Sequence, residues 1–162
     1  MVVAWIVLRR CAPQENPRPQ DASSVTKQKR LLPPELPAIR GTPPIILPVA
    51  SEAARLNDPD LTAADDLAIL TTMLGEYRRH LGGNPVGDND EITAALLGAN
   101  PKRLACLPTN TGRYLDNAGR LIDRWGAPYF FHALSLSNME ILSAGPDSIL
   151  YTADDLRGGD AE

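Results

Sequence analysis

The sequence predicts an α+β fold, in which a long N-terminal helix packs on a small antiparallel sheet and an acidic loop lies near the C-terminus. Three observations support this class. Residues 62–81 repeat apolar side chains at helical spacing. Residues 104–143 alternate short apolar runs with turn formers, which is typical of antiparallel strands. Residues 145–155 then gather three aspartates in a turn-rich segment.

The chain divides into an apolar N-terminal segment at 1–11, a proline-rich linker at 12–50 and a globular domain at 51–162. The first segment starts with eight apolar residues, whereas a helix that spans a membrane needs about 20. It also lacks the basic start and cleavage site of a secretory signal. Three interpretations stay open: the tail of a longer membrane anchor, a short interfacial anchor that contacts the membrane, or a buried strand.

Residues 12–50 hold nine of the fifteen prolines, so a sustained helix or central strand is excluded there. We expect an extended spacer, and a proline-rich ligand for a partner domain is the alternative. Near its end, residues 45–47 are apolar and are expected to dock on the domain as a short strand.

The long helix has clear signals at both ends. Thr62 and Asp65 match a capping box, and Gly82-Gly83 supplies a left-handed stop. Between them, one apolar face repeats at spacings of three and four, which predicts packing on a sheet: Leu67, Leu70, Leu74, Tyr77 and Leu81.

The elements after this helix are shorter. A second helix of about nine residues is expected to begin at Asp88 or Asn89 and to end at Gly98. Trp125 is expected to pack over the sheet and to fix the turn before it. Short strands are predicted at 104–107, 113–115, 120–122, 129–134 and 139–143, the last four as two hairpins.

Composition and motifs argue against several function classes. The net charge of −4 gives no reason to expect nucleic acid, whose binding surfaces are basic. The chain has no metalloprotease helix motif, nucleophile elbow or phosphate-binding glycine loop, and His80 and His132 lie apart, as surface or packing residues. Cys106 is expected to be a small buried hydrophobe. The chain is therefore not expected to be an enzyme.

The acidic loop is the best candidate site. Asp147, Asp154 and Asp155 offer carboxylate oxygens, and carbonyls of the turn from Ile149 to Thr152 would complete a shell of oxygens. Calcium prefers about six to eight oxygen ligands in flexible geometry, so this loop predicts a calcium site. The alternative is an acidic turn held by its own side-chain to backbone hydrogen bonds.

The order of the motifs resembles one protein family. The motifs are Gly87-Asp88-Asn89, Leu97-Gly98-x-Asn100-Pro101, Trp125-Gly126-x-Pro128-Tyr129, Ile141-x-Ser143-x-Gly145-x-Asp147 and Thr152-x-Asp154-Asp155. Over residues 60–156 they resemble the C-terminal globular domain of type II secretion major pseudopilins and their pilin-like relatives. The chain departs from the family at Ser148 and Tyr151, where glycines are usual. If those glycines adopt positive φ, the two substitutions strain the loop.

The resemblance implies a pilin-like fold, a structural calcium in the acidic loop, and a fibre-forming component of the periplasm or cell envelope that is anchored in the membrane. Its partners would be other pseudopilin or secretion-machinery subunits. The alternative is a free-standing extracytoplasmic module that calcium stabilises and that does not polymerise. The missing processing motif of the family favours this alternative.

Overall fold

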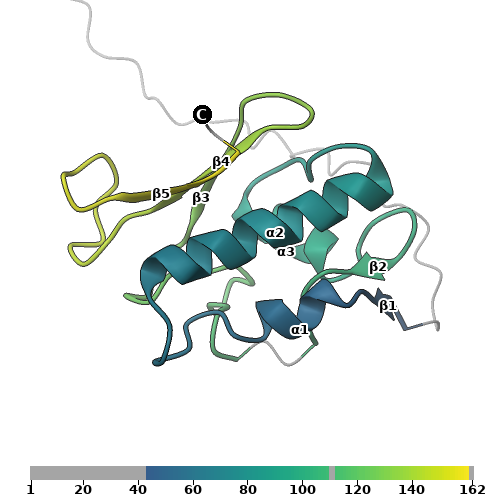
Figure 1. The fold of residues 1–162 in the computed structure, drawn as a ribbon, viewed down its shortest axis with the longest axis horizontal. Coiled ribbons are helices and arrows are strands. Elements are labelled where there is room, and N and C mark those ends of the chain that lie inside the picture. Colours follow the sequence, from purple (N-terminus) through teal and green to yellow (C-terminus); the bar gives the residue numbers. More distant parts are fainter. Residues whose placement is uncertain (1–42, 110–111, 161–162) are drawn as a thin grey trace, which may run out of the picture. The chain divides into compact units, whose positions relative to one another are not determined.

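The computed structural model describes residues 43–109 and 112–160. They form a mixed fold of helices and strands with a three-stranded antiparallel sheet, which confirms the α+β class in this coarse form (Figure 1). The segment 1–11 and most of the linker 12–50 lie outside the described residues. In chain order the elements are β1 Ile45–Ile46, α1 Val49–Ala53, α2 Ala63–Leu81, α3 Asn89–Leu96, β2 Leu104–Ala105, β3 Phe130–Ala133, β4 Met139–Ser143 and β5 Leu156–Gly159.

Helix α2 begins and ends where the sequence predicts. The amide of Asp65 donates to Thr62 Oγ1 at 3.2 Å, and the amide of Thr62 donates to Asp65 Oδ2 at 2.7 Å. The hydroxyl of Thr62, which donates to Asp65 Oδ2 at 2.6 Å, and then the Thr62 amide hold the pKa of Asp65 below its ordinary value. Gly82 ends the helix at φ +86°. The buried face joins the core and consists of Leu67, Leu70, Met73, Leu74 and Tyr77.

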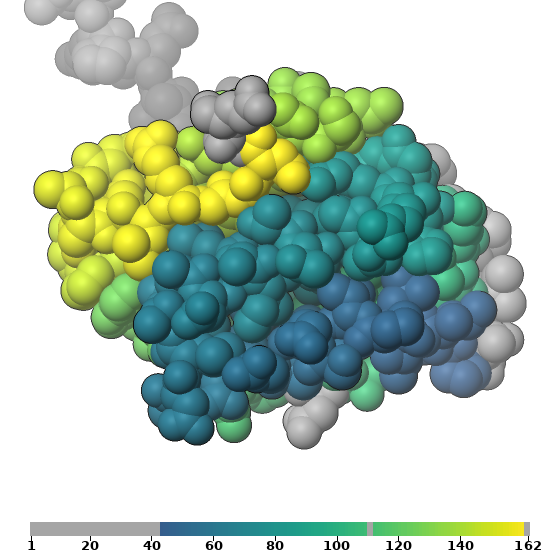
Figure 2. All heavy atoms as spheres, in the orientation of Figure 1, coloured from purple at the N-terminus to yellow at the C-terminus, as the bar shows by residue number. Residues whose placement is uncertain are grey.

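The main sheet has the order β3-β4-β5, with both pairs antiparallel. The predicted hairpin of 129–134 and 139–143 is confirmed as β3 and β4. Strand β5 is not predicted, because its sequence Leu-Arg-Gly-Gly has no strand-forming pattern. Helix α2 packs against β5, and Figure 2 shows the yellow C-terminal residues along the teal helix.

The approach of β5 to its neighbours depends on two glycines. A Cβ at position 158 would lie 2.8 Å from Leu67 Cβ on α2, and one at position 159 would lie 2.0 Å from the carbonyl oxygen of Met139 on β4. The amide of Gly159 then donates to Thr71 Oγ1 at 3.0 Å. The glycines therefore allow helix and strand to meet at backbone distance.

The residues before α2 form a short strand and a short helix, and the strand pairs with β2. The docking predicted for 45–47 is confirmed, since β1 pairs in parallel with β2. Helix α1 lies partly in residues assigned to the linker and is not predicted; its Val49, Ala50 and Ala53 are buried. Strand β2 is shorter than the predicted 104–107, because the amides of Cys106 and Leu107 both donate to the carbonyl of Leu96. Cys106 is free and fully buried, as expected.

The predicted hairpin of 113–115 and 120–122 is reduced to a single bridge between Leu115 and Leu121. Its turn is held mainly by Asp116, whose Oδ1 accepts from the amides of Ala118 and Arg120 at 2.9 Å each. The side chain of Asn89 links the backbones of the two neighbouring segments by hydrogen bonds. It accepts from the amide of Leu121 at 2.7 Å and donates to the carbonyl of Tyr129 at 2.6 Å.

None of the helices within residues 43–109 and 112–160 combines the length and apolar character that crossing a membrane requires.

Candidate functional site

The acidic loop connects β4 to β5 and contains all five residues predicted as calcium ligands. Its carboxylates accept backbone hydrogen bonds from the loop itself. Asp147 Oδ1 accepts from the amide of Ile149 at 2.8 Å, and Asp155 Oδ2 accepts from the amide of Tyr151 at 2.6 Å. Asp154 Oδ2 accepts from the amide of Asp147 at 3.1 Å. The three aspartates thus shape the loop from both of its ends.

The hydroxyl of Thr152 is the point where these groups meet. Thr152 Oγ1 lies 2.6 Å from Asp154 Oδ1, 3.1 Å from the carbonyl oxygen of Ile149 and 3.5 Å from Asp155 Oδ1. The contact with Thr152, followed by the bond from the Asp147 amide, lowers the pKa of Asp154 from its ordinary value. The sequence predicted only the carbonyl of Thr152 as a ligand and missed this role of its hydroxyl.

Two loop residues other than glycine have a left-handed backbone. Ser148 has φ +58° and Tyr151 has φ +71°. Such conformations cost about 1–3 kcal/mol each in a residue with a side chain. Gly145, at φ +64°, starts the loop, and a Cβ there would lie 2.4 Å from the carbonyl oxygen of Asp154.

The arrangement is that of a hydrogen-bonded loop. Within residues 43–109 and 112–160, no group of three or more His, Cys, Asp or Glu side chains is placed to hold a metal ion. The oxygens of Asp154, Asp155 and Ile149 meet around one hydroxyl, whereas Asp147 reaches this group through its amide. Backbone amides and the Thr152 hydroxyl thus donate hydrogen bonds to the same carboxylates that are predicted to bind calcium.

A buried carboxylate supports the base of the loop. Asp123 is only 2% exposed, and its Oδ1 accepts from the amides of Trp125 at 3.1 Å and Ala127 at 2.9 Å. Its Oδ2 accepts from the hydroxyl of Ser143, at the end of β4, at 2.7 Å. Ser143 Oγ in turn accepts from the amide of Gly145 at 3.3 Å. Asp123 therefore fixes both the turn before β3 and the first residues of the acidic loop.

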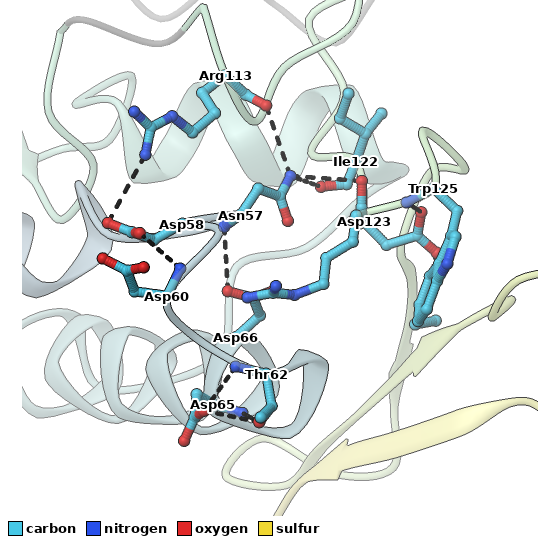
Figure 3. A network of polar contacts seen from close by, with 12 residues as sticks. Asn57, Asp58, Asp60, Thr62, Asp65, Asp66, Arg113, Ile122, Asp123 and Trp125 are labelled. Carbon is cyan, nitrogen blue, oxygen red and sulfur yellow. Dashed lines mark hydrogen bonds and ion pairs between the residues drawn. The ribbon is translucent and has the colours of Figure 1, made fainter.

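The same turn is tied to the start of α2 (Figure 3). Asp66 is fully buried, and its Oδ2 accepts from Arg124 Nε at 2.5 Å. Its Oδ1 accepts from the amide of Asn57 at 3.0 Å, while Asn57 Nδ2 donates to the carbonyl of Ile122 at 3.0 Å. The sequence assigned Asp66 only to the helix dipole. The signal for its burial was its position one residue before Leu67, on the edge of the apolar face.

The two histidines are surface residues, as expected. His80 Nε2 lies 3.8 Å from Glu76 on the same helix, and His132 Nδ1 lies 3.3 Å from Glu140 across the hairpin. Trp125 is 40% exposed in the turn that Asp123 holds.

Comparison of the chain with protein-family models, with curated proteins and with solved structures finds no match in any of the three.

Proposed function

We propose that this protein is a structural, non-enzymatic component of a type II secretion or related pilus-like assembly, with a pilin-like fold that calcium stabilises. One observation carries the proposal. The acidic loop joins the last two strands of an antiparallel sheet, and Ser148 and Tyr151 hold positive φ where the family uses glycine. A left-handed backbone at both positions is what substitution of those glycines without a change of loop shape would produce.

Calcium would be held by the carboxylates of Asp147, Asp154 and Asp155 and by the carbonyls of Ile149 and Thr152. These are hard oxygen donors, which calcium prefers. The ion would replace hydrogen bonds that the loop now makes to its own amides and to the Thr152 hydroxyl. Since the ion would bind only the folded loop, it would add stability by mass action.

In such an assembly the N-terminal segment and the domain would have different surroundings. Residues 1–11 would contact the membrane and other pseudopilin or secretion-machinery subunits, and the described domain would face the periplasm or cell surface. The domain's acidic character suits this role, because residues 51–162 hold 17 Asp and Glu against 9 Lys and Arg. No nucleic acid partner is proposed.

A second candidate is a free-standing extracytoplasmic module that calcium stabilises and that does not polymerise. The internal hydrogen bonds of the loop are compatible with it, because the carboxylates of Asp147, Asp154 and Asp155 each accept a backbone amide of the same loop.

The test is thermal unfolding of the full chain with calcium and with a chelator, beside the double variant Asp147→Ala, Asp154→Ala. The matched control is Asp90→Ala, which removes an exposed carboxylate from α3. A calcium-dependent rise in melting temperature that only the double variant loses would support the metal loop. Identical curves for the unmodified chain would overturn it.

Assembly is tested separately, by sedimentation and electron microscopy of the full chain in detergent with calcium. Filaments would support the pilus-like proposal. A chain that calcium stabilises but that forms no filaments would favour the free-standing module.

A further inference from the structure

One edge strand of the three-stranded sheet has unpaired backbone groups, and this observation is independent of the proposed function. Strand β3 is at one edge of the order β3-β4-β5, and β5 is at the other (Figure 1). At the β5 edge α2 packs against the strand, and Thr71 Oγ1 accepts from the outward amide of Gly159. The β3 edge is therefore the side of this sheet at which another strand could pair.

The register identifies which backbone groups face outward. The amide of Leu134 donates to the carbonyl of Asn138, so these two residues form a hydrogen-bonded pair of the hairpin. Because such pairs alternate along an antiparallel ladder, the backbone groups of Phe131 and Ala133 point away from β4. Tyr129, two residues earlier, agrees with this alternation, since its amide donates to the carbonyl of Leu121 at 3.0 Å.

Along this edge, Tyr129 is the last residue whose outward backbone groups are hydrogen-bonded. Its carbonyl accepts from Asn89 Nδ2, so both of its outward groups are paired. Within the described residues, no hydrogen bond reaches the outward amides and carbonyls of Phe131 and Ala133. The strand Phe-Phe-His-Ala also has no lysine, proline or bulge, which are the usual devices that keep edge strands from pairing.

Charge indicates what would pair with this edge. The domain is strongly acidic, so most contacts between two copies would be repulsive. Strand β3 carries no carboxylate, and the neighbouring Glu140 is neutralised by Arg157 at 3.1 Å and faces His132 at 3.3 Å. A second copy of the chain therefore meets little like-charge repulsion at β3.

We propose that two copies associate through β3 as an antiparallel pair about a two-fold axis. Phe131 of each copy lies opposite Ala133 of the other, so that all outward amides and carbonyls of these residues are used. His132 then faces His132 of the second copy in the intervening non-hydrogen-bonded pair. An isologous interface of this kind closes on itself. With a short strand at its centre, the dimer is weak, with a dissociation constant in about the micromolar to millimolar range.

The test is sedimentation velocity of the full chain over that concentration range, with two variants. Ala133→Pro removes an outward amide and leaves the bonds to β4 intact, so it should weaken dimerisation about tenfold or more. Leu136→Ser, the matched control, changes a side chain that is 74% exposed on the hairpin loop and should leave dimerisation unchanged. If Ala133→Pro fails to fold by circular dichroism, His132→Lys replaces it, because it sets like charges opposite each other at the axis.

A second measurement fixes the register. In a Cys11→Ser background, His132→Cys should form an intermolecular disulfide on mild oxidation, because the two side chains face each other, whereas Ser137→Cys should not. The proposal is overturned if the unmodified chain stays monomeric over this concentration range. A monomer that pairs with an extended peptide of another protein would overturn it as well. It is also overturned if Ala133→Pro or its replacement dimerises like the unmodified chain, if Leu136→Ser weakens dimerisation equally, or if both cysteine variants cross-link equally.

Discussion

The hydroxyl of Ser143 donates a 2.7 Å hydrogen bond to the buried carboxylate of Asp123, and this bond joins the end of β4 to the turn before β3. Both side chains are almost fully buried, at 1% and 2% exposure. The same serine oxygen accepts from the amide of Gly145, the residue at which the acidic loop begins. The position of the loop on the sheet is therefore set by a residue 20 positions earlier in the chain.

Ser143→Ala should lower the free energy of unfolding by about 1–3 kcal/mol, because it leaves one oxygen of a buried carboxylate without a partner. Urea denaturation measures the change. Ser137→Ala, on the exposed hairpin loop, is the control and should change little. Equal stabilities of the Ser143→Ala variant and the unmodified chain would contradict a structural role for this bond.

Arg124→Ala should be more severe and should cost about 3–5 kcal/mol of unfolding free energy, because Asp66 would be left as an unpaired buried charge. Chemical denaturation again gives the value. The matched control is Arg113→Ala, whose pair with Asp58 is long, at 3.8 Å, and only partly buried. Such surface pairs contribute about 0–1 kcal/mol. If the two variants lose similar amounts of unfolding free energy, the buried pair of Arg124 and Asp66 stabilises the fold no more than a surface pair does.

Ser148→Gly and Tyr151→Gly should each raise the free energy of unfolding, by up to about 1 kcal/mol. Glycine removes strain of about 1–3 kcal/mol at a positive φ, and its greater freedom in the unfolded chain offsets part of the gain. Ser137→Gly, at a residue whose φ is not positive, should be neutral or destabilising. The expectation fails if the two loop variants are destabilised as much as this control.

The pKa of Asp154 should move up toward its ordinary value in Thr152→Val, since the contact with Thr152 is the main cause of the lowering. Carbon-13 NMR titration of the carboxylates measures it. Because the folded pKa lies below the unfolded one, Asp154 contributes stability above the unfolded pKa, and this contribution is lost as the pH falls through the folded pKa. Thr72→Val, on the exposed side of α2, should leave the titration of Asp154 unchanged.

Much of the local structure could be predicted from the sequence. The capping box of Thr62 and Asp65, the stop at Gly82 and the hairpin of β3 and β4 all depend on residues a few positions apart, and the structure has each of them. For Ser148 and Tyr151 the sequence supported only a conditional statement, that the loop is strained if these positions have positive φ, and the structure shows positive φ at both. Local signals act within one turn or one hairpin, so they are readable before the fold is known.

Tertiary structure alone decided the rest. Strand β5 has no strand pattern, and it forms because Gly158 and Gly159 let the chain lie against Leu67 and the carbonyl of Met139. Asp66 and Asp123 read as polar residues of a helix start and a turn, but Arg124 and Ser143, far away along the chain, make their burial possible. Burial of a charge depends on partners that the fold brings together, and a pattern along the sequence does not contain that information.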